Sequence, residues 1–193
     1  MNEEFIRLLQ INIASRSVGP STARRMGPPK TVQAARDFLC KIDLTHFKTR
    51  TPETFDSILN ATTEQFVTEL PRDAQHWGSA RKFLNIFLRN TLYNRFLCER
   101  YELQALEPWL EVPLDRYVGT SLRSEKGGDS LPRWKTVIGL TPEQSSAYQT
   151  FANSVARQKG TYRVHLDLLY WRSTKTANHA LQSTVTRFAA RGG

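Results

Sequence analysis

The sequence has few of the residues that build covalent or metal cross-links. It contains two cysteines, Cys40 and Cys98, and four scattered histidines in 193 residues. Two cysteines cannot supply the disulfide framework of a small secreted domain, so we interpret them as thiols in a reducing compartment. CxxC and HExxH motifs are absent, and no histidines cluster, so we expect no zinc site, no other metal and no cofactor.

Several motifs for other chemistry are also missing. The chain has no GxxxxGK[ST], GxGxxG or GxSxG pattern and no carboxylate-x-Lys pair, which argues against nucleotide hydrolysis, dinucleotide binding, α/β-hydrolase chemistry and restriction-type nucleases. No run of 18 apolar residues occurs, so a membrane span is not expected. The opening segment, MNEEFIRLLQ, is acidic and amphipathic, which is not typical of a secretory signal. We therefore expect a cytoplasmic, nucleoid-associated protein.

What the chain has in excess is positive charge, and most of it is arginine. Lys and Arg number 27 against 18 Asp and Glu, for a net charge of +9, and 19 of the 27 are arginines. The guanidinium fork fits phosphates and base edges, so this balance favours a nucleic-acid partner. The alternative is an ordinary basic enzyme.

Apolar residues recur at helical spacing along almost the whole chain. The spacing predicts helices over residues 3–14, 30–42, 52–70, 78–101, 115–123 and 142–159. Residues 162–171 suit either a helix or a strand, and no other segment alternates with a period of two. We predict an all-α fold, with one helical catalytic unit over residues 1–173 and a polar C-terminal tail over 174–193 that we expect to be partly flexible.

Two ionisable residues stand near predicted helix starts. Lys82 lies early in the longest helix and Asp115 begins the next one. A helix N-terminus lowers the pKa of a lysine and stabilises a carboxylate. A lysine with a lowered pKa beside a proton acceptor can attack a sugar C1′, displace the base and form a Schiff base. Asp115 alone could stabilise an oxocarbenium-like sugar and orient water. The alternatives are that Asp115 is only an N-cap and that Lys82 only contacts phosphate or solvent.

The segment from Leu70 to Val118 resembles the catalytic core of the helix-hairpin-helix DNA glycosylases. Residues 112–118 (VPLDRYV) match the family's Pro-Val-Asp-x-x-Val element, with Leu in place of Val. Residues 70–78 (LPRDAQHWG) replace the family's Leu-Pro-Gly-x-Gly hairpin, with a longer segment that lacks the first glycine. The archaeal 8-oxoguanine glycosylases are the branch that the chain is most similar to.

The resemblance implies a two-lobed helix-hairpin-helix fold with an atypical hairpin and a catalytic core at about residues 70–123. It implies that Lys82 is the Schiff-base nucleophile and Asp115 the catalytic carboxylate. It also implies that backbone N–H groups over residues 77–80 hold a phosphate, as the family's hairpin does.

Further residues are candidates for contacts with DNA and with an extruded base. The polar stripe of Lys82, Asn85 and Arg89 on an apolar helix is expected to face a cleft. The expected DNA contacts are Arg24, Arg25, Trp77, Gly78, Ser79, Arg81, Asn85 and Arg89. The expected base-pocket residues are Tyr117, Arg163, His165, Asp167 and Trp171. For the aromatic residues the alternative is core packing, and for Arg24 and Arg25 it is a basic surface loop.

Together these features predict a DNA glycosylase that acts as a monomer on double-stranded DNA and cleaves the N-glycosidic bond of a modified base. Lys82 would decide whether strand cleavage at the abasic site follows. Base-excision repair and defence against modified phage DNA both fit. The alternatives are a non-catalytic helical DNA- or RNA-binding protein and a small nuclease with dispersed carboxylates.

Overall fold

A computed structural model describes residues 2–171, and every regular element in that range is helical. This confirms the all-α prediction. The named α-helices are α1 (Glu3–Ser17), α2 (Lys30–Leu39), α3 (Pro52–Glu69), α4 (Trp77–Leu92), α5 (Arg95–Tyr101), α6 (Arg116–Ser124) and α7 (Pro142–Gln158). Short 3-10 turns separate them: η1 (Leu44–Phe47), η2 (Arg72–Ala74), η3 (Leu103–Leu106), η4 (Gly128–Ser130) and η5 (Arg163–His165). A further helix begins at Leu166.

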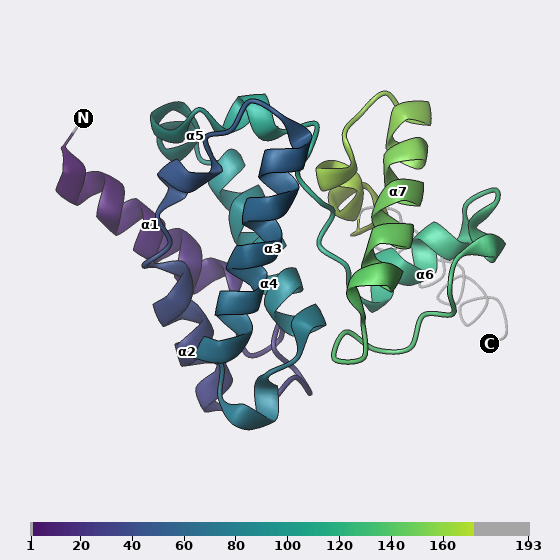
Figure 1. Cartoon of the computed structure of the whole chain (residues 1–193), viewed down its shortest axis with the longest axis horizontal. Helices are drawn as coiled ribbons and strands as arrows, with labels where there is room; N and C mark the ends of the chain where they lie inside the picture. Colours follow the sequence, from purple (N-terminus) through teal and green to yellow (C-terminus); the bar gives the residue numbers. More distant parts are fainter. Residues whose placement is uncertain (1, 172–193) are drawn as a thin grey trace, which may run out of the picture.

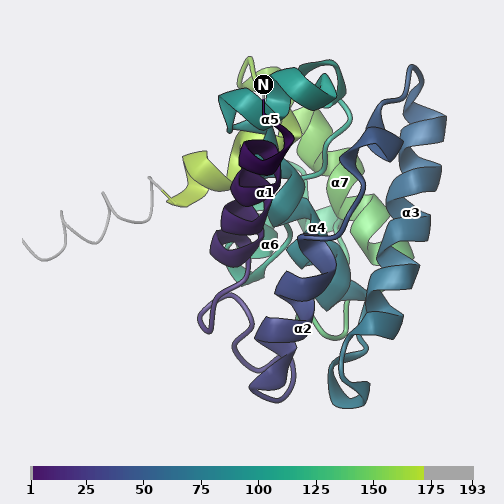
Figure 2. The same ribbon diagram turned by 90° about the vertical axis from the view of Figure 1, so that its left-hand side faces the viewer.

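The buried apolar side chains form two clusters rather than one. The first is built mainly by α1–α5 and surrounds α4, which packs against α1, α2, α3 and α5. The second begins at Val112 and is built by α6, α7 and the segment that ends at Tyr170. Figure 1 shows the corresponding lobes side by side, and Figure 2 shows α1, α2 and α3 arranged around α4. The chain crosses from one cluster to the other at Glu111.

Local sequence signals explain several helix boundaries. At α3, the Thr51 side chain accepts a hydrogen bond from the Thr54 N–H, and Pro52 occupies the first helical position. At α7, Thr141 and Gln144 form a reciprocal capping box. These helices begin where their caps predict, because a cap satisfies backbone donors that the helix itself leaves open.

The helix predicted over residues 78–101 is wrong as a single element. It is two helices, because α4 ends at Leu92 and Asn94 caps α5 by accepting a hydrogen bond from the Leu97 N–H at 3.1 Å. Both helices pack on the first cluster, so the apolar spacing continues across the break and conceals it.

Residues 163–171 are helical, with a 3-10 turn followed by the helix that begins at Leu166, and this decides between the two structures that the sequence of 162–171 allowed. The predicted tail over 174–193 lies outside the described residues. Between residues 2 and 171 no helix is both long enough and apolar enough to cross a membrane.

Candidate functional site

A large groove opens where the two lobes meet, and basic residues dominate its lining. It encloses about 1500 Å³ and receives residues from the loop after α1, from α4, from α6, from the loop between α6 and α7, and from the helix that begins at Leu166. Its basic residues are Arg16, Arg24, Arg25, Lys82, Arg89, Arg116, Arg123, Arg133 and Lys135, and its acidic residues are Asp115 and Asp167. One third of the 27 cations of the chain therefore line one groove, which is the pattern of a polyanion-binding surface.

Lys82 lies in the second turn of α4 and reaches the groove with a side chain that is only 8% exposed. Its Nζ donates a hydrogen bond to the Thr22 carbonyl at 3.2 Å. Burial lowers the pKa of Lys82, and the nearby charge of Asp115 opposes this only in part. The lowering that the sequence predicts from a helix terminus therefore has a different main cause, which is desolvation.

Asp115 is both a helix cap and a groove residue. It precedes α6, and its Oδ1 accepts a hydrogen bond from the Val118 N–H at 3.0 Å. The approach to it is rigid, because Gln149 bonds both the N–H and the carbonyl of Val112. A cap needs one carboxylate oxygen, so the cap interpretation and the catalytic one are compatible.

Three of the five base-pocket candidates line the same groove: Tyr117, Asp167 and Trp171. Asp167 forms an ion pair with Arg89, and its other oxygen, Oδ1, is buried and has no hydrogen-bond partner within residues 2–171. Tyr117 and Trp171 are both exposed, and their ring centroids lie 5.6 Å apart. Of these candidates, the two rings give the groove an aromatic surface that can stack on a base.

Arg81 and Asn85 do not line this groove. The Arg81 guanidinium is 5% exposed and bonds both oxygens of Glu111, at 2.8 and 2.9 Å, and the Thr63 hydroxyl at 2.9 Å. The Asn85 amide donates to the same Glu111 carboxylate at 2.8 Å. These side chains are occupied inside the protein, so the structure does not support the expected contacts with DNA.

The Glu111 carboxyl is charged in this setting. Burial raises its pKa, but the charge and hydrogen bonds of Arg81, the charge of Arg163 and the Asn85 hydrogen bond lower it, and the net effect is a lowered pKa. Glu111 lies where the chain passes from the first cluster to the second. Its ion pair with Arg81 therefore joins α4 to the start of the second lobe.

The start of α4 is covered rather than open to a phosphate. The N–H groups of Ser79 and Ala80 both donate to the His76 carbonyl. A Cβ at Gly78 would lie 2.1 Å from the Val137 carbonyl oxygen, so this glycine is needed for close packing against the loop between α6 and α7. The Trp77 ring stacks against Arg81, whose Cζ lies 5.3 Å from its centroid. The phosphate contact expected over residues 77–80 therefore does not fit this packing.

Arg163 and His165 also have structural partners away from the groove. Arg163 donates to the carbonyls of Trp109 and Leu110. The His165 ring lies between the Tyr93 hydroxyl and a Glu107 carboxylate oxygen, at 2.7 Å from each. Both side chains tie η5 to the first lobe, and neither lines the groove that holds Asp115.

Sequence reasoning missed part of the groove. The loop between α6 and α7 contributes Arg133, Trp134, Lys135 and Ile138. Two cations flanking a tryptophan were a usable signal for this loop. The Thr22 carbonyl that holds Lys82 has no sequence signal, because every residue carries a backbone carbonyl.

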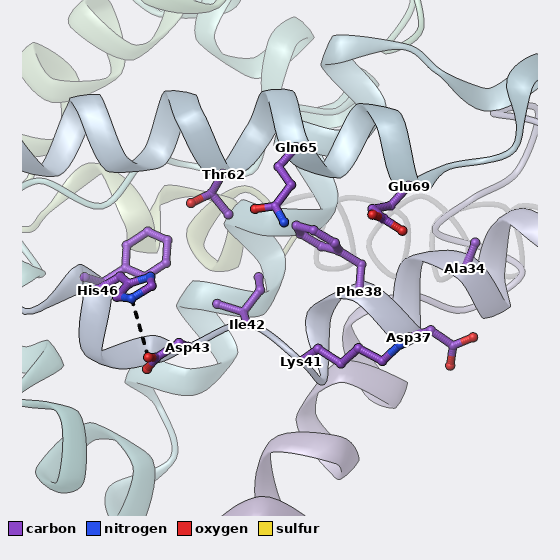
Figure 3. Close-up of a pocket in the computed structure, with 11 residues that line it drawn as sticks. Ala34, Asp37, Phe38, Lys41, Ile42, Asp43, His46, Thr62, Gln65 and Glu69 are labelled. Atoms are coloured by element: carbon purple, nitrogen blue, oxygen red, sulfur yellow. Dashed lines mark ion pairs between the residues drawn. The ribbon is translucent and has the colours of Figure 1, made fainter.

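A second pocket of about 560 Å³ lies between α2, η1 and α3 in the first lobe. Figure 3 shows its residues, with the Gln65 side chain beside the Phe38 ring and the Asp43–His46 ion pair at one end. Phe38 stacks on Phe66 at a centroid distance of 4.3 Å, so its ring also belongs to the core. None of the predicted site residues lines this pocket.

Over residues 2–171, no three His, Cys, Asp or Glu side chains come together as potential metal ligands. Comparison with protein-family models, with curated proteins and with solved structures gave no match to this chain.

Proposed function

We propose that this protein is a DNA glycosylase that releases a modified base with Lys82 as nucleophile and Asp115 as the catalytic carboxylate. The observation that carries the proposal is that these two residues line one cation-rich groove, where the charge of Asp115 acts on the Lys82 amine. Their sequence positions are 33 apart, and only the meeting of the two lobes unites them.

The buried lysine is suited to nucleophilic attack. Its lowered pKa leaves more neutral amine than a surface lysine has at the same pH. The Nζ lone pair attacks C1′ and the N-glycosidic bond breaks, so its electron pair leaves with the base. The amine then passes a proton to the Asp115 carboxylate, and the released base takes a proton from water. The C1′–O4′ bond breaks, the Asp115 carboxyl gives its proton to O4′, and the nitrogen lone pair forms the C=N bond of the Schiff base. Before the amine attacks C1′, Lys82 must break its hydrogen bond to the Thr22 carbonyl.

The other groove residues have roles in the same proposal. The exposed rings of Tyr117 and Trp171 would stack on the extruded base, and the ion pair with Asp167 would hold Arg89 in place beside it. Arg24 and Arg25 stand on the loop after α1, where they would contact the phosphates of the strand. Resemblance of residues 112–118 to the glycosylase motif supports the same assignment of Asp115.

The test is base release in the presence of EDTA. A panel of duplexes, each with one oxidised, deaminated, alkylated or hydroxymethylated base, is incubated with the protein and then treated with alkali. We expect alkali-labile sites on at least one duplex, and we expect Asp115→Asn to reduce their formation about a thousandfold, as the loss of one electrostatic catalytic group does. Asn caps a helix as well as Asp, so the stability of this variant should not change.

Matched controls separate the possible outcomes. Asp129→Asn removes an exposed carboxylate outside the groove and should leave base release unchanged. Borohydride should trap a covalent complex that Lys82→Gln abolishes and Lys41→Gln retains. DNA binding without any product would instead support the non-catalytic binding protein, and cleavage that EDTA abolishes would support the nuclease.

A further inference from the structure

One apolar side chain in the basic groove stands at the tip of a turn. Ile138 lines the groove and is 40% exposed. It follows Val137 in a β-turn that a hydrogen bond closes, from the Leu140 N–H to the Val137 carbonyl at 3.1 Å. The Gly139 N–H also donates to the Thr136 hydroxyl at 3.2 Å. These two hydrogen bonds fix the turn, and the turn exposes the Ile138 side chain to solvent.

The base of this turn is held by both lobes. Val137 is buried in the first apolar cluster and Leu140 in the second. Gly78, at the start of α4, packs directly against the Val137 carbonyl and the Leu140 side chain. In Figure 1 the connection from α6 to α7 runs under the C-terminal lobe toward the other lobe. The turn thus has a rigid support on each side.

Extrusion of a base from a duplex leaves a gap in the stack. The unstacking energy must be offset, and proteins that deform DNA commonly insert an apolar side chain such as Ile, Leu or Phe between base steps. Such a side chain must be exposed, apolar and firmly supported, and cations must hold the backbone beside it. Ile138 meets these conditions, since Arg133 and Lys135 stand on the same loop and line the same groove.

The other exposed apolar residues of the groove are placed differently. Tyr117 lies in α6, and Leu168 and Trp171 lie in the helix that begins at Leu166. The rings of Tyr117 and Trp171 are neighbours with centroids 5.6 Å apart, so together they form an aromatic surface that suits a base that is already extruded. Only Ile138 among these four residues is carried by a turn rather than a helix.

We propose that Ile138 is the wedge that enters the base stack when the target nucleotide leaves it. This rests on the proposed function, because a wedge serves an enzyme that extrudes a base. Ile138 is accordingly a positioning residue, which acts on the duplex and not on the glycosidic bond.

The test compares duplex with single-stranded substrate under single-turnover conditions. On the panel duplex from which the wild type releases a base, Ile138→Ala should slow release about tenfold, because the extruded state loses its filler. On the same strand without its complement the rate should stay within about twofold, because no stack has to be opened. Ile138→Leu should restore the duplex rate. Equal loss on both substrates, or no loss on either, would overturn the proposal.

Controls and a second readout keep the result interpretable. Ile11→Ala removes a similarly exposed side chain from α1 outside the groove and should change neither rate. A duplex-specific loss with Leu168→Ala but not with Ile138→Ala would also overturn the assignment. The second readout is the fluorescence of 2-aminopurine in a duplex, which the wild type should raise on binding and Ile138→Ala should not. If the wild type raises this fluorescence but releases no base, the glycosylase proposal fails while the wedge stands.

Discussion

Arg81 and Lys82 are neighbours in sequence, both are buried in α4, and yet they serve two different regions of the molecule. Arg81 faces the interior and makes a two-pronged pair with Glu111. Lys82 faces the groove. Among residues 2–171 its amine has one hydrogen-bond partner, the Thr22 carbonyl, and the charge of Asp115 lies farther off.

In the proposed function, this contrast separates a structural cation, Arg81, from a nucleophilic one, Lys82. A buried guanidinium with a carboxylate on both of its prongs is satisfied and stays charged. A buried amine without a bonded carboxylate carries a desolvation cost, and its pKa falls. Burial is common to both residues, so the partner decides the role.

The largest expected effect is on stability and comes from removing the charge that pairs with Arg81. Glu111→Gln leaves the buried Arg81 guanidinium without the carboxylate that it pairs with, and we expect the free energy of unfolding to fall by about 3–5 kcal/mol. Urea denaturation measures it. Glu102→Gln, which removes an exposed pair with Lys48, should cost less than about 1 kcal/mol.

The same variant has a pH signature. Because the folded pKa of Glu111 lies below its ordinary value of 4.5, its charge stabilises the fold above that pH and loses this effect as the pH falls further. Below pH 4.5 the free energy of unfolding of the wild type should therefore fall more steeply than that of Glu111→Gln, which has no carboxylate at this position. Parallel acid profiles of the two proteins would contradict the assignment.

An effect of intermediate size is expected on the reactivity of the Lys82 amine. Borohydride trapping on a duplex that already contains an abasic site isolates the amine step from base release. The trapping rate should rise about tenfold per pH unit and level off at the pKa of Lys82, below the ordinary 10.5, because only the neutral amine attacks. A rise that continues through pH 10.5 would show an unperturbed lysine.

Asp115→Asn sharpens this measurement. The Asp115 charge raises the pKa of Lys82, so its removal should move the plateau to lower pH. An unchanged plateau would mean that the two residues do not interact.

The smallest effect concerns the rim of the groove. Arg24→Ala should weaken DNA binding to a similar degree on any sequence and reduce the slope of log K against log salt by about one. Arg7→Ala removes an exposed arginine of α1 outside the groove and should leave the slope unchanged. Fluorescence anisotropy with a labelled duplex over a range of salt concentrations measures both slopes.

The sequence was sufficient where a feature depends on near neighbours along the chain. Pro52 after Thr51 placed the start of α3, and the VPLD segment placed Asp115 at a helix start. It failed where a feature depends on which side of a helix meets which lobe. Lys82, Asn85 and Arg89 share a stripe by spacing, but Asn85 lies at one side of that stripe and donates to Glu111, while the other two line the groove.

What the sequence determined by itself was the helical fold class, most helix boundaries and a net charge that favours a polyanion, since all three follow from residue types and local spacing. The tertiary structure decided that Lys82 and Asp115 line one groove, that Arg81 is withdrawn from it, and that Ile138 stands on a turn braced by both lobes. These outcomes depend on how the two apolar clusters pack against each other, and that packing sums many weak contacts between residues far apart in the chain.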